Sequence, residues 1–277
     1  MDLICKYINL KSAKDRKKYF EEQLIDKLFV FERINAFDTS EIKLLGIKGK
    51  LHDRGKAIFL SHFEAIKNSS NSRFDTWISE DDTLISKKCL HILKDLNVEK
   101  YNWDIIFTDV CFGDPSEILK LFHLNQVLKK QNKINIIPLK EKFFSSLNSY
   151  IINKSSVKKI TKLIQKNNIN LDENLDIFIA RLVRSGEIKG FSFFPFISSV
   201  NDNADSDGTH CSSIQYLVNL VRKLFYFEDN LIRSKDLNIL NRYFPSGDMD
   251  RNSQYMLRIQ RAFLHPNMFS RLNNSNT

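Results

Sequence analysis

The sequence lacks most of the signals that mark membrane, secreted and metal-cluster proteins. No apolar run among its 277 residues approaches the roughly 20 residues of a membrane-spanning helix. Residues 1–6 do not resemble a signal peptide. The four cysteines are scattered without a C-x-x-C pair, which argues against a disulfide framework and a zinc site. We therefore expect a soluble protein of the reducing cytoplasm.

The sequence also lacks a nucleic-acid platform, because no stretch of aromatic residues is interleaved with Lys and Arg. A net charge of +9 nevertheless favours anionic partners, such as nucleotide phosphates or a phospholipid surface. Residues 212–277 hold nine basic and five acidic residues, so +4 of this charge lies in the last quarter of the chain.

The sequence does contain a regular alternation of strand-like and helix-like patterns. Expected strands span residues 3–10, 29–36, 74–78, 103–110, 134–138, 149–152 and 191–200. Expected helices span residues 12–28, 57–67, 87–96, 155–165 and 175–183. This alternation predicts an α/β fold with a mainly parallel sheet, which binds ligands at the carboxyl ends of its strands. The residues expected at these ends are Asn9, Ala36, Asp82 and Asp109.

The C-terminal part follows a different pattern. Residues 200–208 are polar and are expected to form a loop, after which two apolar stripes recur at helical spacing. We therefore predict an α/β domain at residues 1–211 and a helical basic extension at residues 212–277. Two interpretations of the extension stay open: it docks on an anionic membrane, or it is a helical cap whose arginines are solvated.

The most informative motif is the acidic triplet Glu80-Asp81-Asp82, which follows a stretch rich in β-formers. Three adjacent carboxylates at the end of a buried strand repel one another and are costly to desolvate. A divalent cation removes this conflict, because hard cations bind carboxylate oxygens and can bridge them to substrate phosphates. The simpler interpretation is a solvated acidic turn, but the strand and the surrounding motifs favour a metal site.

Further motifs accompany the triplet in a fixed order within residues 1–200. In chain order they are Ile8-Asn9-Leu10, Asp15-Arg16, Arg33-Ile34-Asn35-Ala36, Ser61-His62, Glu80-Asp81-Asp82, Ser149-Tyr150-Ile151-Ile152 and Leu175-Asp176. This series resembles glycosyltransferase family 25 of the lipooligosaccharide-biosynthesis type. The resemblance implies a GT-A-like fold, a nucleotide-sugar donor that is most often UDP-galactose, a divalent metal, and inversion at the anomeric carbon.

In such an enzyme Glu80 and Asp82 would hold Mn²⁺ or Mg²⁺ against the donor diphosphate and so stabilise the leaving group. Asp81 could replace Glu80 as a metal ligand, or face the ribose or the sugar, because alternate residues of an extended segment point to opposite sides. Arg16 would reach the nucleotide from the first helix, or else be a solvated helix arginine.

Four smaller or neutral residues complete the expected nucleotide site. Asn9 and Ala36 would border the base-binding cleft, or simply end their strands. Ser61 would cap the N-terminus of its helix whatever its other role. His62 would contact phosphate or sugar, or would make only local hydrogen bonds.

The candidate general base is Asp176, which lies near a helix start beside apolar residues. Other carboxylates compete for this role, and any of them could be merely solvated: Asp109, Asp172 and Glu173. A late metal ligand or a cover over the donor could come from His210 or from the group Asp202, Asp205 and Asp207, although a flexible acidic loop is the simpler interpretation.

These observations together predict a metal-dependent hexosyltransferase, adding galactose to a bacterial surface glycan or glycolipid such as lipooligosaccharide or capsule. It would work in the cytoplasm, at the inner face of the membrane. A different donor, UDP-glucose or a UDP-N-acetylhexosamine, stays open. The rival class is a non-catalytic module that docks on membrane, against which the intact acidic triplet argues.

Overall fold

A computed structural model of the full chain describes residues 3–26, 29–95, 98–112, 114–167 and 171–201, together with residues 219, 222, 223 and 227. The chain divides into two compact units, one of Met1–Asp205 with Tyr226–Asp229 and one of Ser206–Phe225 with Asn230–Thr277. The acidic group at residues 202–207, His210, and the predicted stripes of residues 212–277 lie outside the described residues, apart from the four single positions. The domain boundary after residue 211 stays a prediction.

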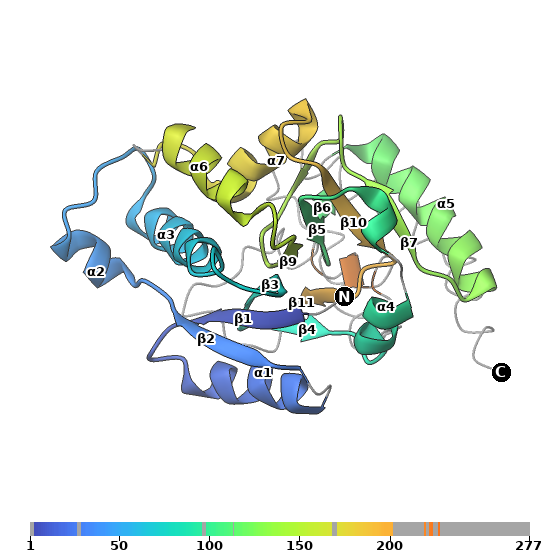
Figure 1. Cartoon of the computed structure of the whole chain (residues 1–277), viewed down its shortest axis with the longest axis horizontal. Coiled ribbons are helices and arrows are strands. Elements are labelled where there is room, and N and C mark those ends of the chain that lie inside the picture. The colour runs from blue at the N-terminus through green and yellow to red at the C-terminus, as the bar shows by residue number, and fades with distance from the viewer. Residues whose placement is uncertain are drawn as a thin grey trace, which may run out of the picture. The chain divides into compact units, whose positions relative to one another are not determined.

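The first unit is built on a seven-stranded sheet in the order β2-β1-β3-β9-β5-β10-β7 (Figure 1). Its strands are β1 (Leu3–Asn9), β2 (Phe31–Asn35), β3 (Asp75–Glu80), β5 (Ile105–Phe107), β7 (Asn135–Pro138), β9 (Ser149–Ile152) and β10 (Gly190–Phe194). Only β7 and β9 run against the common direction of the other five. The predicted α/β class with a mostly parallel sheet is therefore confirmed.

Two short ribbons and the helices complete the described structure. The ribbons pair β4 (Thr83–Ile85) with β11 (Ser198–Val200) and β6 (Cys111–Phe112) with β8 (Phe144–Ser145). The helices are α1 (Lys14–Asp26), α2 (Thr39–Leu44), α3 (Asp53–Lys67), α4 (Cys89–Asp95), α5 (Pro115–Gln131), α6 (Val157–Asn167) and α7 (Leu175–Ser185), with a 3₁₀ turn at Val98–Tyr101. Within the described ranges, no helix combines the length and the apolar character needed to cross a membrane.

The core lies on both faces of the sheet because its central strands are apolar at successive positions. On one face Tyr7 packs on Phe20 of α1, with ring centroids 5.3 Å apart, and Trp77 meets Phe29 edge-on at 5.2 Å. The neighbouring residue Ile78 is also fully buried and, by the alternation of a strand, faces the opposite side. Figure 1 shows α1 on one side of β1 and β2, and α3 with α6 on the other.

The prediction that Ser61 caps its helix is wrong. Helix α3 begins at Asp53, where His52 is the N-cap and its Nδ1 accepts a hydrogen bond from the Gly55 backbone N–H at 3.0 Å. Ser61 lies inside the helix and donates its hydroxyl to the Ala57 carbonyl at 2.7 Å. The weak helix propensity of Gly55 hid the true start in the sequence.

The strand ends meet as expected. Because β1, β2, β3 and β5 share one direction, their carboxyl ends lie on the same edge of the sheet. This edge carries the residues predicted for it: Asn9, Ala36, Asp82 and Asp109. The amino end of the antiparallel strand β9 reaches the same edge between β3 and β5, where the Glu80 N–H donates to the Asn148 carbonyl at 2.8 Å.

Candidate active site

The acidic triplet spans the end of β3 and the tight turn into β4. Glu80 is the last residue of β3, and the Asp81 N–H still donates to the Ile8 carbonyl of β1 at 3.1 Å. The side chains of Glu80 and Asp81 consequently point to opposite faces of the sheet, as the alternation of a strand requires. Each therefore meets a different set of partners.

Asp81 faces β1 and α1 and is buried. One carboxylate oxygen accepts from Asn9 Nδ2 at 2.5 Å, and the other lies 3.5 Å from Arg16 Nε. Asn9 in turn accepts from Arg33 Nε at 2.7 Å. A connected row therefore runs from Arg33 through the neutral Asn9 to Asp81 and Arg16, so the Asp81 carboxylate is held by an amide and a guanidinium rather than left solvated.

Glu80 faces α3, where it meets His62. The ring nitrogen Nε2 of this fully buried histidine lies 3.1 Å from Glu80 Oε1, and Nδ1 lies 3.1 Å from the Tyr150 hydroxyl. Burial and the nearby charge of Glu80 raise the pKa of Tyr150 well above its usual value, so the phenol keeps its proton. Tyr150 can thus donate to Nδ1, which leaves Nε2–H to donate to Glu80 in the neutral imidazole.

Asp82 is the least compensated of the three carboxylates. Its Oδ1 is buried and has no hydrogen-bond partner. Burial, together with the negative charges of Glu80 and Asp81, raises its pKa to about 8, although the positive charge of Arg16 acts in the opposite direction. A buried acceptor oxygen surrounded by like charge is costly unless a cation or a donor reaches it.

The triplet fits a metal that also binds substrate. No group of three His, Cys, Asp or Glu side chains suited to a metal ion occurs in the described part of the chain. The protein could therefore offer two carboxylates, Glu80 and Asp82, and phosphate oxygens would have to complete the shell. The orphaned oxygen of Asp82 and its raised pKa are what such a cation would relieve.

Ala36 and Ser61 together hold the loop that follows β2. The Ala36 N–H donates to the Asn9 carbonyl at 3.0 Å, and the Phe37 N–H donates to Ser61 Oγ at 2.9 Å. This places the loop against both β1 and α3 at the edge where the triplet lies. The nucleotide contacts expected of Asn9, Arg16, Ala36, Ser61, His62 and Asp81 stay predictions.

The candidate bases differ in access. Asp176 is half-buried at the start of α7, and its Oδ2 accepts from the Ser146 backbone N–H at 3.4 Å. Asp109 is fully buried, whereas the other two carboxylates are engaged at the surface. Asp172 accepts from the Lys50 backbone N–H at 3.1 Å, and Glu173 pairs with an arginine of α7 at 2.9 Å. Asp176 is therefore half-buried and accepts a long hydrogen bond from a backbone N–H, whereas Asp172 and Glu173 pair with basic side chains.

A run of hydrogen bonds links Asp176 to the triplet. Ser146 Oγ accepts from the Asn148 N–H at 3.3 Å, and the Asn148 carbonyl accepts from the Glu80 N–H at 2.8 Å. Ser146 has φ 99°, a conformation that is costly for a serine and is retained where surrounding structure fixes it. The loop before β9 thus joins the two acidic sites.

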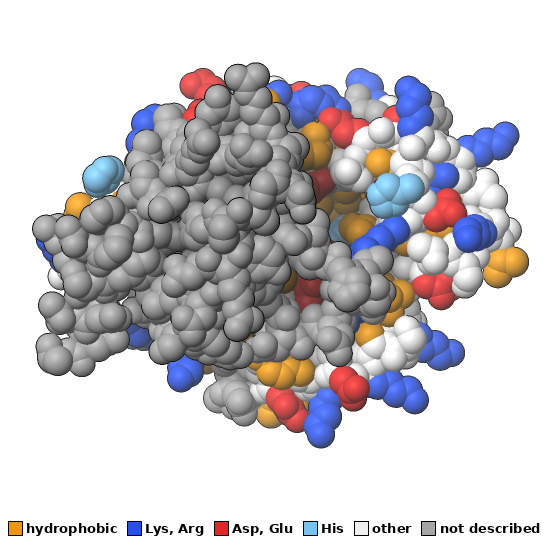
Figure 2. Space-filling view, turned by 180° about the vertical axis from the view of Figure 1, so that it is seen from behind, with side chains coloured by type: hydrophobic (Ala, Val, Ile, Leu, Met, Phe, Trp, Pro, Cys, Tyr) orange, Lys and Arg blue, Asp and Glu red, His pale blue; other side chains and the backbone are white. Residues whose placement is uncertain are grey.

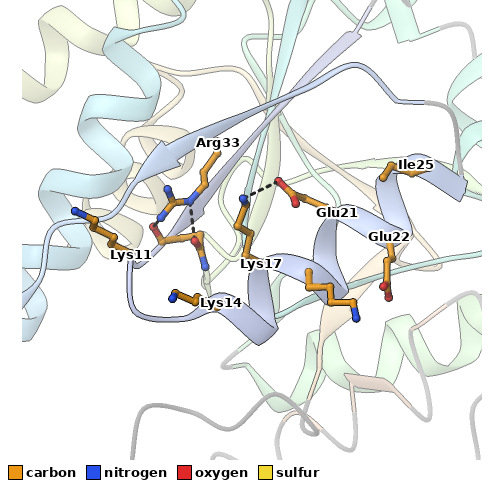
Figure 3. A pocket seen from close by; sticks show the side chains of 9 residues that line it. Lys11, Lys14, Lys17, Glu21, Glu22, Ile25 and Arg33 are labelled. Carbon is orange, nitrogen blue, oxygen red and sulfur yellow. Dashed lines mark hydrogen bonds and ion pairs between the residues drawn. The ribbon is translucent and has the colours of Figure 1, made fainter.

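A basic pocket of about 510 Å³ adjoins Asn9, between α1 and β2 (Figure 3). At one end of the pocket Arg33 Nε donates to Asn9 Oδ1 at 2.7 Å, and Figure 3 shows Lys17 paired with Glu21 along the helix. Five basic and two acidic residues are among its lining, so it attracts anions. Elsewhere on the described surface, the face in Figure 2 shows basic side chains dispersed among acidic ones.

A mostly parallel sheet that presents paired carboxylates and a basic pocket at one edge is typical of enzymes that act on phosphate-bearing substrates. The family model for glycosyltransferase family 25 (LPS biosynthesis protein) matches residues 6–175, more than half of the chain, and the chain belongs to this family. The match includes the candidates from Asn9 to Glu173, whereas Asp176 and the later group Asp202, Asp205, Asp207 and His210 follow its last position. No curated protein matches the chain.

Three contributors to the site were not predicted as such. Arg33 and Tyr150 belong to motifs that the sequence displays, so their presence near the site had a signal, but nothing in the sequence indicated that Arg33 would contact Asn9 or that Tyr150 would contact His62. Ser146 had no signal of any kind, because its role depends on a backbone N–H and on a left-handed φ.

Proposed function

We propose that the protein is a metal-dependent, inverting glycosyltransferase. It moves a hexose, for which galactose is the first candidate, from a UDP-sugar to a bacterial surface glycan. The observation that carries this proposal is the buried, unpartnered Oδ1 of Asp82 and the raised pKa of this residue, beside Glu80 at the carboxyl edge of the sheet. Membership of the family supplies the reaction class. The donor and the stereochemistry rest on the resemblance.

Glu80 and Asp82 would hold Mn²⁺ or Mg²⁺, which when bound neutralises charge on the departing diphosphate. His62 fixes the Glu80 carboxylate from behind, and Asn9 with Arg16 does the same for Asp81. These contacts set the site before substrate arrives, which lowers the cost of reorganisation during the reaction.

The donor would lie along the carboxyl edge, with its nucleoside near Asn9 and Ala36 and its phosphates near the triplet. The basic pocket beside Asn9 would raise the local concentration of the anionic donor. Arg16 would add a positive charge close to the phosphates, because its guanidinium already lies beside Asp81.

Asp176 would accept the proton of the acceptor hydroxyl. The hydroxyl oxygen attacks the anomeric carbon from the side opposite the diphosphate, and the bond from this carbon to the diphosphate oxygen breaks. The electron pair leaves with the diphosphate, and the displacement inverts the anomeric centre. The half-buried position of Asp176 at the amino end of α7 suits a base that a bulky acceptor must reach.

Hydrolysis of UDP-galactose, UDP-glucose and UDP-N-acetylglucosamine tests the proposal, each with Mn²⁺ and after EDTA. We expect UDP release that needs the metal, is fastest with UDP-galactose and is lost in Asp82→Ala. Turnover that EDTA leaves unchanged contradicts metal dependence, and faster turnover of another sugar changes the donor. Nucleotide binding without any turnover would favour the non-catalytic module.

We propose that the basic side chains within residues 212–277 contact anionic membrane, where a lipid-linked acceptor would be found. Each basic side chain near an anionic surface contributes about 1 kcal/mol. Co-sedimentation with anionic and neutral vesicles, at low and high salt, tests this point. Equal, negligible binding to both vesicle types would exclude the membrane contact and leave the catalytic proposal unaffected.

A further inference from the structure

A second pocket, of about 340 Å³, lies beside the proposed base. It is formed by one side of α7 and by residues 142–145, in the segment that leads into β9. Ile177, which lines the pocket, directly follows Asp176 in the chain. Ser145, on the opposite wall, directly precedes Ser146, whose N–H donates to Asp176 Oδ2. Asp176 is not itself among the lining residues, but it adjoins one wall in the chain and the other through its hydrogen bond with Ser146.

The walls of this pocket carry apolar surface that the fold leaves in water. Phe143 is 65% exposed and Ile177 is 44% exposed. Large exposed apolar side chains that line a concave site indicate a binding surface, whereas isolated ones do not. A phenyl ring of this kind matches the apolar C–H face of a pyranose ring, which buries its carbon face while its hydroxyls stay in water.

The charged residues of the pocket are not equivalent. Arg181 pairs with Glu173 at 2.9 Å, and Lys142 pairs with Glu117. Arg184 lies over the Phe143 ring, 4.3 Å from its centroid, and has no carboxylate partner among the described residues. A guanidinium that an aromatic ring holds in place, without a counter-ion, is suited to pair with a phosphate or carboxylate group.

The segment that carries Phe143 is held in a specific conformation. Two non-glycine residues with positive φ flank it, Glu141 at φ 65° and Ser146 at φ 99°. The Glu141 N–H donates to the Arg184 carbonyl at 3.4 Å, and Ser146 donates to Asp176, so the segment is fastened to both ends of α7. Such costly conformations persist where the surrounding structure fixes the geometry of a site.

We propose that this pocket is the acceptor subsite and that it binds a saccharide carrying a phosphate or carboxylate group. The sugar ring packs on Phe143, the anionic group pairs with Arg184, and the reacting hydroxyl points toward Asp176. The inference rests on the proposed function, because Asp176 relates the pocket to the chemistry. Its volume lies near the lower limit of small-ligand sites, about 300–1,000 Å³, which suits a short saccharide.

Saturation-transfer NMR tests binding directly with four probes: methyl β-galactoside, methyl β-glucoside, galactose 6-phosphate and glucose 6-phosphate. The variants are Phe143→Ala and Arg184→Gln. Matched controls are Phe74→Ala, at a phenylalanine 46% exposed, and Arg73→Gln, both just before β3 at the opposite edge of the sheet. We expect the wild-type protein to bind the sugar phosphates more tightly than the neutral glycosides.

Phe143→Ala should weaken all binding by about threefold to tenfold, as expected for a lost aromatic contact. Arg184→Gln should weaken only the phosphates, by about tenfold. Both controls should bind like the wild type. Absence of binding to the wild type, or equal binding to all five proteins, overturns the subsite.

A transfer assay separates this inference from the proposed function. In Phe143→Ala the acceptor KM should rise about threefold to tenfold while the donor KM stays unchanged. An acceptor KM that is the same in Phe143→Ala and in the wild type would overturn the subsite and leave the proposed function intact. Saccharide binding that requires Phe143, in a wild-type protein without any donor turnover, overturns the proposed function and leaves a saccharide site.

Discussion

Asp104 is a buried carboxylate and Asp82 is a partly buried one whose Oδ1 is buried; they lie at opposite edges of one sheet and have opposite surroundings. Asp104 immediately precedes β5 and is 7% exposed. Its Oδ1 accepts from the Ser156 hydroxyl at 2.6 Å, and its Oδ2 accepts from Lys159 Nζ at 2.6 Å and from the Lys189 N–H at 2.8 Å. Although burial alone would raise its pKa, these donors lower it overall.

Asp82 follows β3 at the other edge and has the reverse balance. No donor reaches its buried Oδ1, and burial with two neighbouring acidic charges raises its pKa to about 8. Because the fold provides Asp104 with donors from Ser156, Lys159 and Lys189, it could equally have provided donors for Asp82. We propose from this difference that Asp104 serves the structure and that Asp82 binds a positive charge supplied from outside the chain.

Substitution of Asp82 should have the largest effect on activity and little on stability. Asp82→Ala removes a carboxylate that the folded protein does not compensate, so we expect unfolding free energy within about 1 kcal/mol of the wild type. Transfer should fall by roughly 10³-fold or more because the diphosphate loses its counter-charge. Thermal unfolding and a UDP-release assay measure the two effects, and full activity in the variant would contradict the metal-dependent mechanism.

Asp176→Asn should lower the transfer rate by about 10²- to 10⁴-fold while donor affinity changes little, because the variant lacks a general base but keeps the donor site. Asp172→Asn is the matched control, since that carboxylate contacts Lys50 at the surface. Single-turnover transfer and UDP titration separate the rate from binding. Loss of donor binding instead would make Asp176 a donor or metal contact and leave Asp109 as the candidate base.

His62→Gln should weaken metal binding rather than abolish turnover. His62 fixes Glu80 through Nε2, and removing such a supporting contact costs about 10- to 100-fold in metal affinity. Activity as a function of Mn²⁺ concentration should therefore shift to higher metal and recover at saturation. The exposed histidine of α4, His91, provides the control His91→Gln. A loss of activity that metal cannot restore would give His62 a direct role with substrate.

The sequence predicts the acidic site at the carboxyl edge of the sheet, but it does not predict the role of Asp104 at the other edge. The triplet can be recognised in the sequence because three carboxylates in a row after a β-rich stretch are unusual. The common direction of the strands then places it beside Asn9 and Ala36. Asp104 gave no such signal. Its partners come from α6, from the residue just before α6 and from the segment before β10, so its compensation depends on contacts distant in sequence.

The same reasoning explains errors in the predicted helices and strands. Helix α5 was not predicted, because Asn125 occupies a buried position between Leu121 and Leu128 and interrupts the apolar stripe. The expected strand at residues 191–200 is instead two strands, because Pro195 cannot donate to a ladder and ends β10 at Phe194.

Asp104→Asn should reverse the result expected at Asp82. An asparagine keeps an acceptor for Ser156, but its amide group would face Lys159 Nζ and the Lys189 N–H, so donors would oppose donors. We expect a loss of about 1–3 kcal/mol in unfolding free energy, with transfer per folded molecule unchanged. Denaturant unfolding and active-site titration check both parts. A variant as stable as the wild type would remove the contrast between the two edges.

The pH dependence of stability provides the finest test of the role of Asp104 in this comparison. The Asp104 pKa in the folded protein is lowered, whereas in the unfolded chain it takes the ordinary value of about 3.9. The folded state therefore binds this proton less readily, so the contribution of Asp104 is fully present above about pH 4 and is lost as pH falls through the folded pKa. The stability difference between wild type and Asp104→Asn should accordingly shrink below about pH 4 and stay constant from there to neutral pH. Urea unfolding of both proteins between about pH 2.5 and 7 measures it. A difference that stays constant down to the lowest pH would show that packing, and not the ionised carboxylate, provides the stability at this edge.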